Sequence, residues 1–299
     1  MKKSLISLAV LASVAFASSA NAADLASKKA PPGPMAPVPM WKGFYVGLNA
    51  GGIWGNNSSI TANTYPTSSY TQSNPAYWVM GNGAMSGSSQ GGFIGGGQVG
   101  YNWQPGLLNN NLVFGFEADI QGIAGSKGNR NYSTAYAVGT ETLTNTTTAN
   151  ANLQFLGTVR GRVGYLAMPN LLIYGTGGLA YGGVSFNVTK YINEFASNGV
   201  QNWTGVGNAN YSNVNVGYTG GGGVEWMFMP NWSAKAEYLY YDLGNVTAEL
   251  ETNKFGIARG VATQPFTSTS LTGRVSGNIA RAGVNYHFNM SPAAVVAKY

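Results

Sequence analysis

A period-two alternation of apolar and polar residues restricts the fold of this sequence more than any other feature. In residues 44–51 the even positions read Phe, Val, Leu, Ala and the odd positions read Tyr, Gly, Asn, Gly. Successive side chains of a strand point to opposite faces, so this spacing predicts a strand with one apolar face. The same pattern returns in seven further segments, at residues 93–103, 112–121, 153–165, 171–184, 214–228, 232–240 and 280–288. The glycine-rich segment 171–184 leaves its own facing open, but the eight segments together predict an all-β chain.

The connections between these segments are of two kinds. Those after the second, fourth and sixth segments are short, and two of them read Met-Pro-Asn, at residues 168–170 and 229–231. Pro and Asn at such places are typical of tight turns. The connections after the first, third, fifth and seventh segments are long and rich in Asn, Ser, Thr and Gly. This asymmetry predicts an eight-stranded antiparallel up-and-down transmembrane β-barrel with short periplasmic turns and long extracellular loops.

The segments outside the barrel region have signatures of their own. Residues 1–22 combine two lysines, a short apolar stretch and a final Ala-Asn-Ala, which predicts a secretory signal peptide. Residues 23–40 contain five prolines and predict an extended periplasmic leader. The barrel is expected over residues 41–288, and a C-terminal tail is expected over residues 289–299.

The composition argues against a helical membrane protein, a soluble globular domain and a nucleic-acid-binding protein. No apolar run reaches the roughly 20 residues that a membrane-spanning helix needs. Charged residues make up only 9% of the chain, well below the roughly 25% of soluble globular domains. The formal net charge of +6 forms no basic patch in the sequence, so nucleic acid is not an expected partner.

Eight charged residues lie within the predicted strands, and all of them fall on the less apolar face. A Lys or Arg that faces lipid at mid-membrane costs about 2–4 kcal/mol, so this face is expected to line the lumen. The set has four acidic and four basic members: Glu117, Asp119, Glu225, Glu237, Arg160, Arg162, Lys235 and Arg281. A small barrel has room for little beyond side chains, and buried charges need partners. Two interpretations stay open, a packed polar plug and a narrow passage.

Aromatic residues gather near the short-turn ends of the predicted strands. They are expected to form a girdle at the periplasmic membrane interface. Its members are Trp41, Phe44, Trp103, Tyr165, Trp226, Phe228, Trp232, Tyr286 and Phe288. The one histidine, His287, lies on the inward face of the last segment. With one histidine and no cysteine, no metal site, cofactor or catalytic residue is expected, so the chain is not expected to be an enzyme.

Three motifs carry a resemblance to a known family. Residues 41–51 read WKGFYVGLNAG, residues 160–165 read RGRVGY, and residues 281–288 read RAGVNYHF. Together with the Pro-rich leader, they resemble the small outer-membrane immunogenic proteins of Rhizobiales and related bacteria, a family of porin-like β-barrels. One departure is the tail beyond Phe288, because many outer-membrane barrels end on the aromatic residue of the last strand.

The resemblance implies a location in the outer membrane of a Gram-negative bacterium and a role as a surface antigen. It also implies contact with outer-membrane lipid and lipopolysaccharide, and with the barrel-assembly machinery during biogenesis. The leading hypothesis is a structural, surface-exposed, porin-like barrel with a narrow, charge-filled lumen. The alternatives are a small-solute pore and loop-mediated binding of a ligand or host surface. Some relatives are described as haem-binding, but no motif here carries that property over.

Overall fold

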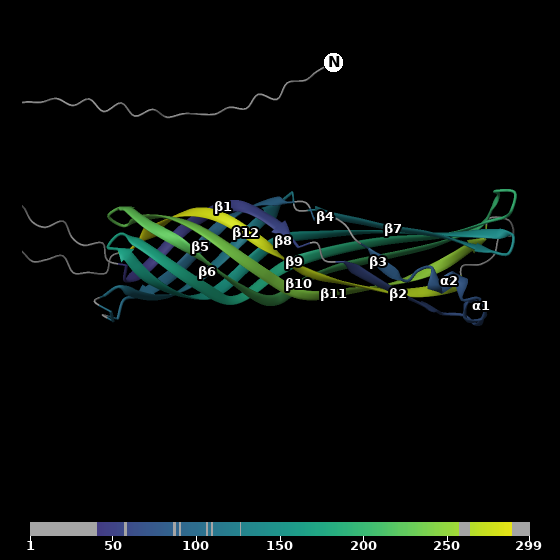
Figure 1. Cartoon of the computed structure of the whole chain (residues 1–299), viewed down its shortest axis with the longest axis horizontal. Coiled ribbons are helices and arrows are strands. Elements are labelled where there is room, and N and C mark those ends of the chain that lie inside the picture. The colour runs from purple at the N-terminus through teal and green to yellow at the C-terminus, as the bar shows by residue number, and fades with distance from the viewer. Residues whose placement is uncertain are drawn as a thin grey trace, which may run out of the picture. The chain divides into compact units, whose positions relative to one another are not determined.

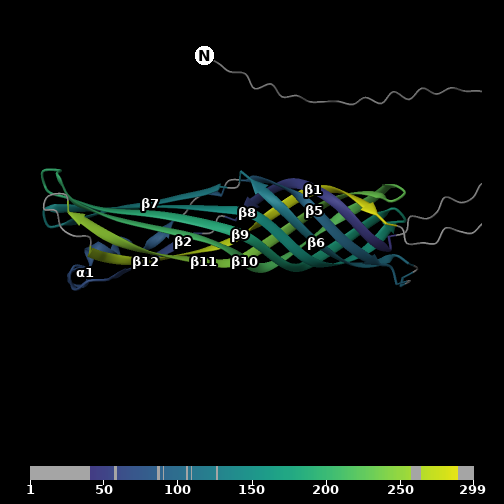
Figure 2. The ribbon, with the colours of Figure 1, turned by 180° about the vertical axis from the view of Figure 1, so that it is seen from behind.

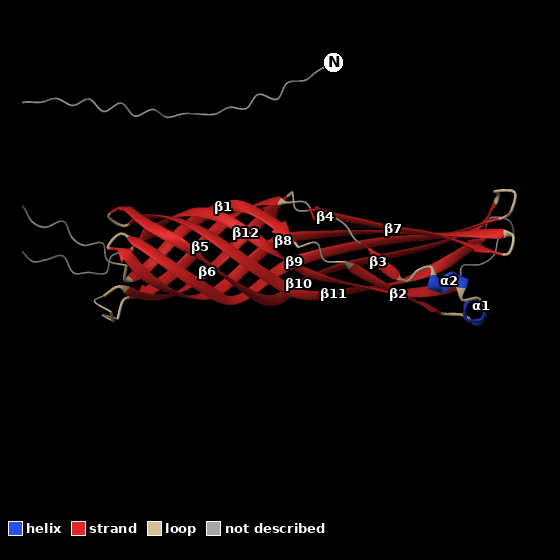
Figure 3. Ribbon diagram, in the orientation of Figure 1, coloured by secondary structure: helices blue, strands red, loops and turns tan. Residues whose placement is uncertain are grey.

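The structure is a computed structural model, and it describes residues 41–56, 59–85, 88–89, 91–105, 107–108, 110–125, 127–256 and 264–288. The expected signal peptide, leader and tail lie outside the described residues. Strands dominate the described part, which also contains two short helices, α1 (Ser69–Ser73) and α2 (Ala76–Val79) (Figure 3). Neither of these helices is long and apolar enough to cross a membrane.

Eight strands close into an antiparallel ring in which each strand pairs with its neighbours in chain order (Figure 1). They are β1 (Gly43–Gly55), β5 (Gly92–Trp103), β6 (Leu112–Ala124), β8 (Glu141–Met168), β9 (Leu171–Phe195), β10 (Gln201–Met229), β11 (Trp232–Gly256) and β12 (Gln264–His287). The pairing of β1 with β12 closes the ring, with Val46 opposite Tyr286. The predicted antiparallel β-barrel is therefore confirmed, although the whole sheet has twelve strands.

The expectation of long loops is wrong for much of the connecting sequence. Four further strands form there: β2 (Ile60–Pro66), β3 (Gly83–Met85), β4 (Ser88–Ser89) and β7 (Lys127–Val138). In addition, β8 to β12 are 24 to 29 residues long, whereas a tilted transmembrane strand needs only about 9–11. Figure 2 shows these strands running on past the ring. We call this part the extension; it comprises β2, β3, β7 and residues 141–152, 185–195, 201–213, 244–256 and 264–275.

The extension is held together by apolar cores of its own. One cluster of buried side chains joins six of its strands, β2, β3, β8, β9, β11 and β12, and includes Ile60, Met85, Phe186, Leu250 and Leu271. A second cluster packs α2 against the extension, where the rings of Tyr77, Trp203 and Phe266 lie with centroids 5.0 to 5.9 Å apart. The extension is thus a packed structure and not a set of independent loops.

The ring has an apolar outer face, and its inner face carries the polar and charged side chains together with a buried apolar cluster that includes Ile94, Leu156 and Leu239. Leu48 and Leu179 are 74% and 61% exposed, whereas Gln98 is buried on the inner face. On β9, Ile173 points outward with Leu179, and Leu172 points inward. These positions show which residues of the glycine-rich segment 171–184 face outward and which face the lumen. The outer face of the ring is therefore the surface that meets lipid.

Leu48→Arg is expected to lower the free energy of unfolding by about 2–4 kcal/mol, because it places a cation on the lipid face near the middle of β1. Unfolding by urea in phospholipid vesicles, followed by the gel shift of the folded barrel, measures the change. Asn150→Arg is the matched control. Asn150 also points outward, but it lies on the extension, so its replacement should change the free energy by less than about 0.5 kcal/mol. Equal effects at both positions would contradict the membrane placement of the ring.

Candidate functional site

Arg160 of β8 lies at the centre of an ion-pair network that fills the lumen. Its Nη1 donates to Glu237 Oε1 and its Nη2 donates to Asp119 Oδ2, both at 2.9 Å. Nη2 also donates to Glu117, and Nε donates to Thr158 Oγ1 at 2.9 Å. Since these carboxylates come from β6 and β11, the guanidinium bridges walls of the barrel that are not neighbours in the ring.

Two more cations complete the central part of this network. Lys235 Nζ donates to both carboxylate oxygens of Glu117, at 2.9 and 3.0 Å. Arg281 Nη2 donates to Asp119 Oδ2 at 2.9 Å and to Glu237 Oε2 at 2.5 Å. Each of the three carboxylates is therefore shared by two or more cations, which satisfies charges that the lumen removes from water.

A second group lies beside the central one. Arg162 Nη1 donates to Glu225 Oε2 and its Nε donates to Asn102 Oδ1, both at 2.9 Å. The guanidinium carbon of Arg162 also lies 4.8 Å from the ring centroid of Tyr45 and 5.2 Å from that of Tyr174. These contacts place the positive charge over two aromatic faces, an arrangement that is favourable in a desolvated site.

The structure thus brings together all eight charges that the sequence assigns to the lumen, and none is more than 5% exposed. Strand register explains why they meet. Three opposite-charge pairs stand directly across from each other on neighbouring strands: Glu117 and Arg160, Glu225 and Lys235, and Glu237 and Arg281. Opposite charges at such cross-strand positions stabilise the pairing, so the same residues that fill the lumen also favour one register.

Trp41 does not lie in the aromatic girdle where the sequence analysis places it. Its side chain is fully buried and packs with Val113, Leu172 and Met227 at the short-turn end of the lumen. Its Nε1 donates to the carbonyl oxygen of Pro169 at 3.1 Å. The physical reason is that the alternation of β1 continues through residue 41, so Trp41 shares the inner face with Tyr45 and not the outer face with Phe44, and its large ring closes the end of the barrel. The other eight predicted members lie on the outer face: Phe44, Trp103, Tyr165, Trp226, Phe228, Trp232, Tyr286 and Phe288.

A Ser-His-Glu group also lies in the lumen. Ser233 Oγ is 2.9 Å from His287 Nε2, and Glu225 Oε1 is 3.2 Å from the same nitrogen. In a catalytic triad the serine and the acid bind different ring nitrogens, which lets the histidine accept a proton while the acid orients it. Here both partners meet at Nε2, and all three residues are buried. This arrangement supplies hydrogen bonds and provides no proton relay.

The sequence analysis missed two features. One is a second set of outward aromatics at the other edge of the apolar band, with Trp54 and Tyr238 in contact at a centroid distance of 6.3 Å. Trp54 lies on the same strand face as Phe44, so the continued alternation of β1 could have revealed it. The other is Lys190, which is fully buried in the extension. Its segment was expected to be a loop, and a loop gives no reason to expect burial.

Lys190 has no described carboxylate as a partner. Its Nζ donates to Thr64 Oγ1 at 3.0 Å and to Thr269 Oγ1 at 2.7 Å. Two hydroxyl groups replace water poorly around an ammonium, and burial lowers the pKa of Lys190 to about 7. Unlike the paired cations of the ring, buried Lys190 lowers the stability of the folded state near neutral pH.

The sequence is similar to known proteins over most of its length. The model of one family, described as the outer membrane protein beta-barrel domain, matches residues 8–288. The 31 kDa outer-membrane immunogenic protein of Brucella melitensis is 36% identical over 290 residues, which cover 93% of this chain and 98% of that protein. The 22 kDa outer membrane protein of Rhizobium leguminosarum is 29% identical over 224 residues, or 74% of each chain. Among solved structures, the outer membrane protein OprG of Pseudomonas aeruginosa is 10% identical, with a TM-score of 0.38 over 83% of this chain and 97% of that chain.

Proposed function

The chain belongs to the outer membrane protein β-barrel domain family and lies in the outer membrane of a Gram-negative bacterium, and from this premise we propose that it is a closed barrel, not a pore. Its lumen is a structural plug, and its role at the surface is carried by the extension. The observation behind this proposal is the bridge from Arg160 to the carboxylates of Asp119 and Glu237. An eight-stranded barrel has an interior just wide enough for its side chains, so these crossing ion pairs leave no open path.

Planar-bilayer recordings test the closed lumen. The refolded barrel should give no discrete conductance steps, because an ion would have to displace buried, mutually paired charges. The double variant Arg160→Ala/Glu237→Ala removes two long side chains of opposite charge from the centre, and it should give steps if the plug is what blocks the lumen. Folding of both samples is verified by the gel shift on heating. Reproducible steps from the folded wild-type barrel would overturn the proposal in favour of a small-solute pore.

We also propose that the chain has no catalytic activity. Its relatives carry names that describe outer-membrane and immunogenic proteins. The strongest candidate for a catalytic group is Ser233 with His287 and Glu225, whose geometry lacks a proton relay. In addition, Ser233 is fully buried and cannot reach a substrate without opening the barrel.

A specific surface favours a second candidate role, which is contact with the saccharide part of lipopolysaccharide. Asn129, Asn150, Asn187 and Asn210 stand directly opposite one another across β7, β8, β9 and β10. All four are exposed, and an uncharged amide row suits the hydroxyl groups of neutral sugars. Of these strands, β8, β9 and β10 continue directly from the lipid-facing part of the ring, where such saccharides begin. For biogenesis, we propose recognition of β12 by the barrel-assembly machinery, because its end carries outward aromatics.

A further inference from the structure

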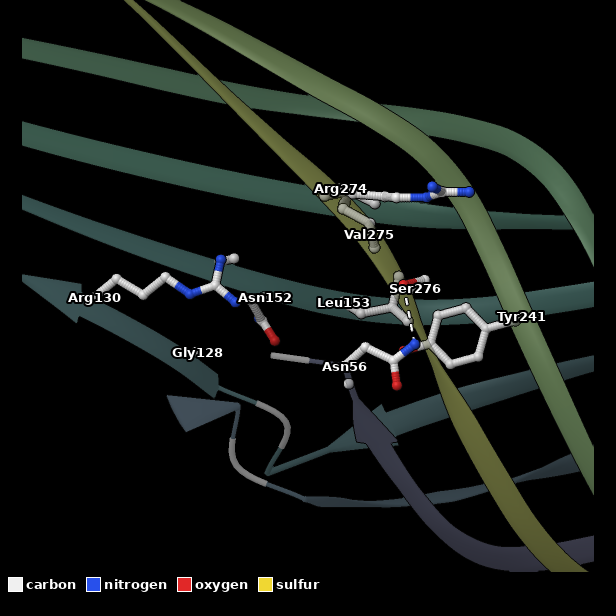
Figure 4. A pocket seen from close by; sticks show the side chains of 12 residues that line it. Asn56, Gly128, Arg130, Asn152, Leu153, Tyr241, Arg274, Val275 and Ser276 are labelled. Atoms are coloured by element: carbon white, nitrogen blue, oxygen red, sulfur yellow. Dashed lines mark hydrogen bonds between the residues drawn. The ribbon is translucent and has the colours of Figure 1, made fainter. Parts of the chain in front are cut away.

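A pocket lies where the ring meets the extension (Figure 4). Its volume is about 90 Å³ and its mouth is open, so it admits only a compact ligand. The pairing of β12 explains its position. Gly277 pairs with β1 and Thr272 pairs with β2, whereas residues 273–275 between them have no described ladder partner on that side. The Asn56 N–H donates to the Ser276 carbonyl oxygen at 2.8 Å and ends the ladder with β1. The interrupted ladder leaves a space between β12 and the start of β7.

Arg130 of β7 points into this pocket (Figure 4). The residue is only 9% exposed, and its Nε has no hydrogen-bond partner among the described residues. No described carboxylate forms an ion pair with its guanidinium. Arg130 therefore differs from the charges of the lumen network, all of which are paired. A guanidinium remains protonated even when buried, and an unpaired buried charge is unfavourable unless something else supplies the anion.

Arg274 also borders the pocket but is already paired. Its Nε and Nη2 donate to Asp242 Oδ2 at 2.9 and 2.5 Å, and its side chain is 55% exposed. In Figure 4 its guanidinium points away from that of Arg130. The pocket therefore presents one available cation.

Apolar side chains form part of the walls around Arg130, beside the polar side chains of Asn56, Asn152 and Ser276. Leu153, Val184 and Tyr241 line the pocket from β8, β9 and β11. A smaller adjoining pocket shares Arg130 and adds Phe186 to the lining. An inorganic anion would match the guanidinium but would leave these apolar walls facing water. One cation beside apolar side chains fits a ligand that carries both an anionic group and an apolar body.

We propose that this pocket binds a small organic carboxylate with a compact apolar body. The carboxylate accepts two parallel hydrogen bonds from Arg130, as guanidinium geometry favours. The apolar body lies against Leu153, Val184 and Tyr241. The site lies outside the lumen network, so it does not depend on whether the lumen conducts.

Binding of 4-fluorobenzoate, measured by fluorine NMR with the refolded barrel in phosphatidylcholine nanodiscs, tests the proposal. We expect saturable binding to the wild type and at least tenfold weaker binding to Arg130→Gln. The neutral analogue 4-fluorobenzamide should bind at least tenfold more weakly than 4-fluorobenzoate. Arg274→Gln is the matched control and should change the dissociation constant less than about twofold, since it leaves Arg130 in place. Because Arg130→Gln removes an unpaired buried charge, it should also raise the urea midpoint of unfolding.

A second variant keeps the charge and changes the shape. Ala151→Leu adds apolar volume at the pocket wall while Arg130 remains, and it should weaken binding at least fivefold. The proposal would be overturned by absence of saturable binding to the folded wild type, by equal affinity of the neutral analogue, or by equal loss in the Arg130 and Arg274 variants. The last result would mean general attraction to positive charge. Inorganic phosphate that competes as well as unlabelled benzoate would also overturn it, because the apolar walls would then contribute nothing.

Discussion

Arg160→Met is expected to destabilise the barrel by about 3–5 kcal/mol, the cost of breaking a buried ion-pair network by removing one partner. Methionine fills similar space, so the main effect is electrostatic. The wild-type network holds four carboxylates and four cations, and the variant leaves one negative charge uncompensated. Glu117, Asp119 and Glu237 each lose one of their hydrogen-bond donors. Urea unfolding of the refolded protein in detergent micelles, with the gel shift as readout, measures the change.

Two comparison variants separate this effect from a general response to losing an arginine. Arg274→Met also breaks an arginine–aspartate pair, but the Arg274 side chain is 55% exposed, and buried Asp242 keeps hydrogen bonds from the Gly244 N–H and the Tyr240 hydroxyl, so its loss should cost less than the loss of Arg160. The double variant Arg160→Met/Glu237→Gln restores charge balance and should recover a measurable part of the stability lost in Arg160→Met. If Arg160→Met costs no more than Arg274→Met, the lumen network does not stabilise the barrel and the proposed plug has no structural role.

The ring could be predicted because membrane and lumen impose opposite demands on neighbouring residues. Along β6, Phe116 and Ile120 face lipid while Glu117 and Asp119 face the lumen. A one-residue error in parity would place carboxylates in lipid, so the charged positions alone determine which face is inside. The short Met-Pro-Asn turns then predicted that the strands they join are neighbours in the barrel, because antiparallel neighbours need only a tight connection.

Much of the extension could not be predicted because parts of its strands carry polar residues on both faces. In residues 141–152, the buried positions include Asn145 and Thr147, and the exposed positions include Thr146 and Asn150. The period-two contrast is therefore almost absent, and a Thr- and Asn-rich strand reads like a loop. What forms these strands is pairing to neighbours on both sides, which satisfies the backbone and suits β-branched threonine.

The same lack of contrast hid two buried cations that have no carboxylate partner among the described residues. Arg130 and Lys190 both lie in segments that the composition assigns to loops, where a cation is expected to face water. Their burial follows from strand facing, which only the structure supplies. Trp41 shows a different error, since it was assigned to the girdle by its place near the strand end, whereas the parity of β1 puts it on the inner face with Tyr45. Strand parity thus located side chains well wherever it was applied.

Lys190→Met is expected to stabilise the extension by an amount that depends on pH. The ordinary lysine pKa of about 10.5 applies to the unfolded chain, whereas burial lowers the pKa of folded Lys190 to about 7. Above about pH 10.5 both states carry a neutral amine and the burial of Lys190 has no electrostatic cost. As the pH falls from 10.5 to 7, only the unfolded state gains a proton, so the folded state loses relative stability. Below pH 7 the full penalty is present, on the order of 4 kcal/mol from this difference in pKa.

The measurement is hydrogen exchange of β9 amides in residues 185–195, corrected for the intrinsic rate, at pH 6.5 and pH 9. In the wild type, the free energy of local opening should be higher at pH 9, because deprotonation removes the penalty. In Lys190→Met, the value should be higher than in the wild type at both pH values and nearly independent of pH. Val188→Met is the matched control, since it introduces the same side chain at the adjacent inward position of β9 and leaves the lysine in place. It should keep the wild-type pH dependence. Parallel pH profiles for Lys190→Met and the wild type would mean that Lys190 stays protonated in the folded extension, with its hydroxyl partners Thr64 and Thr269 solvating the ammonium well enough to keep its charge.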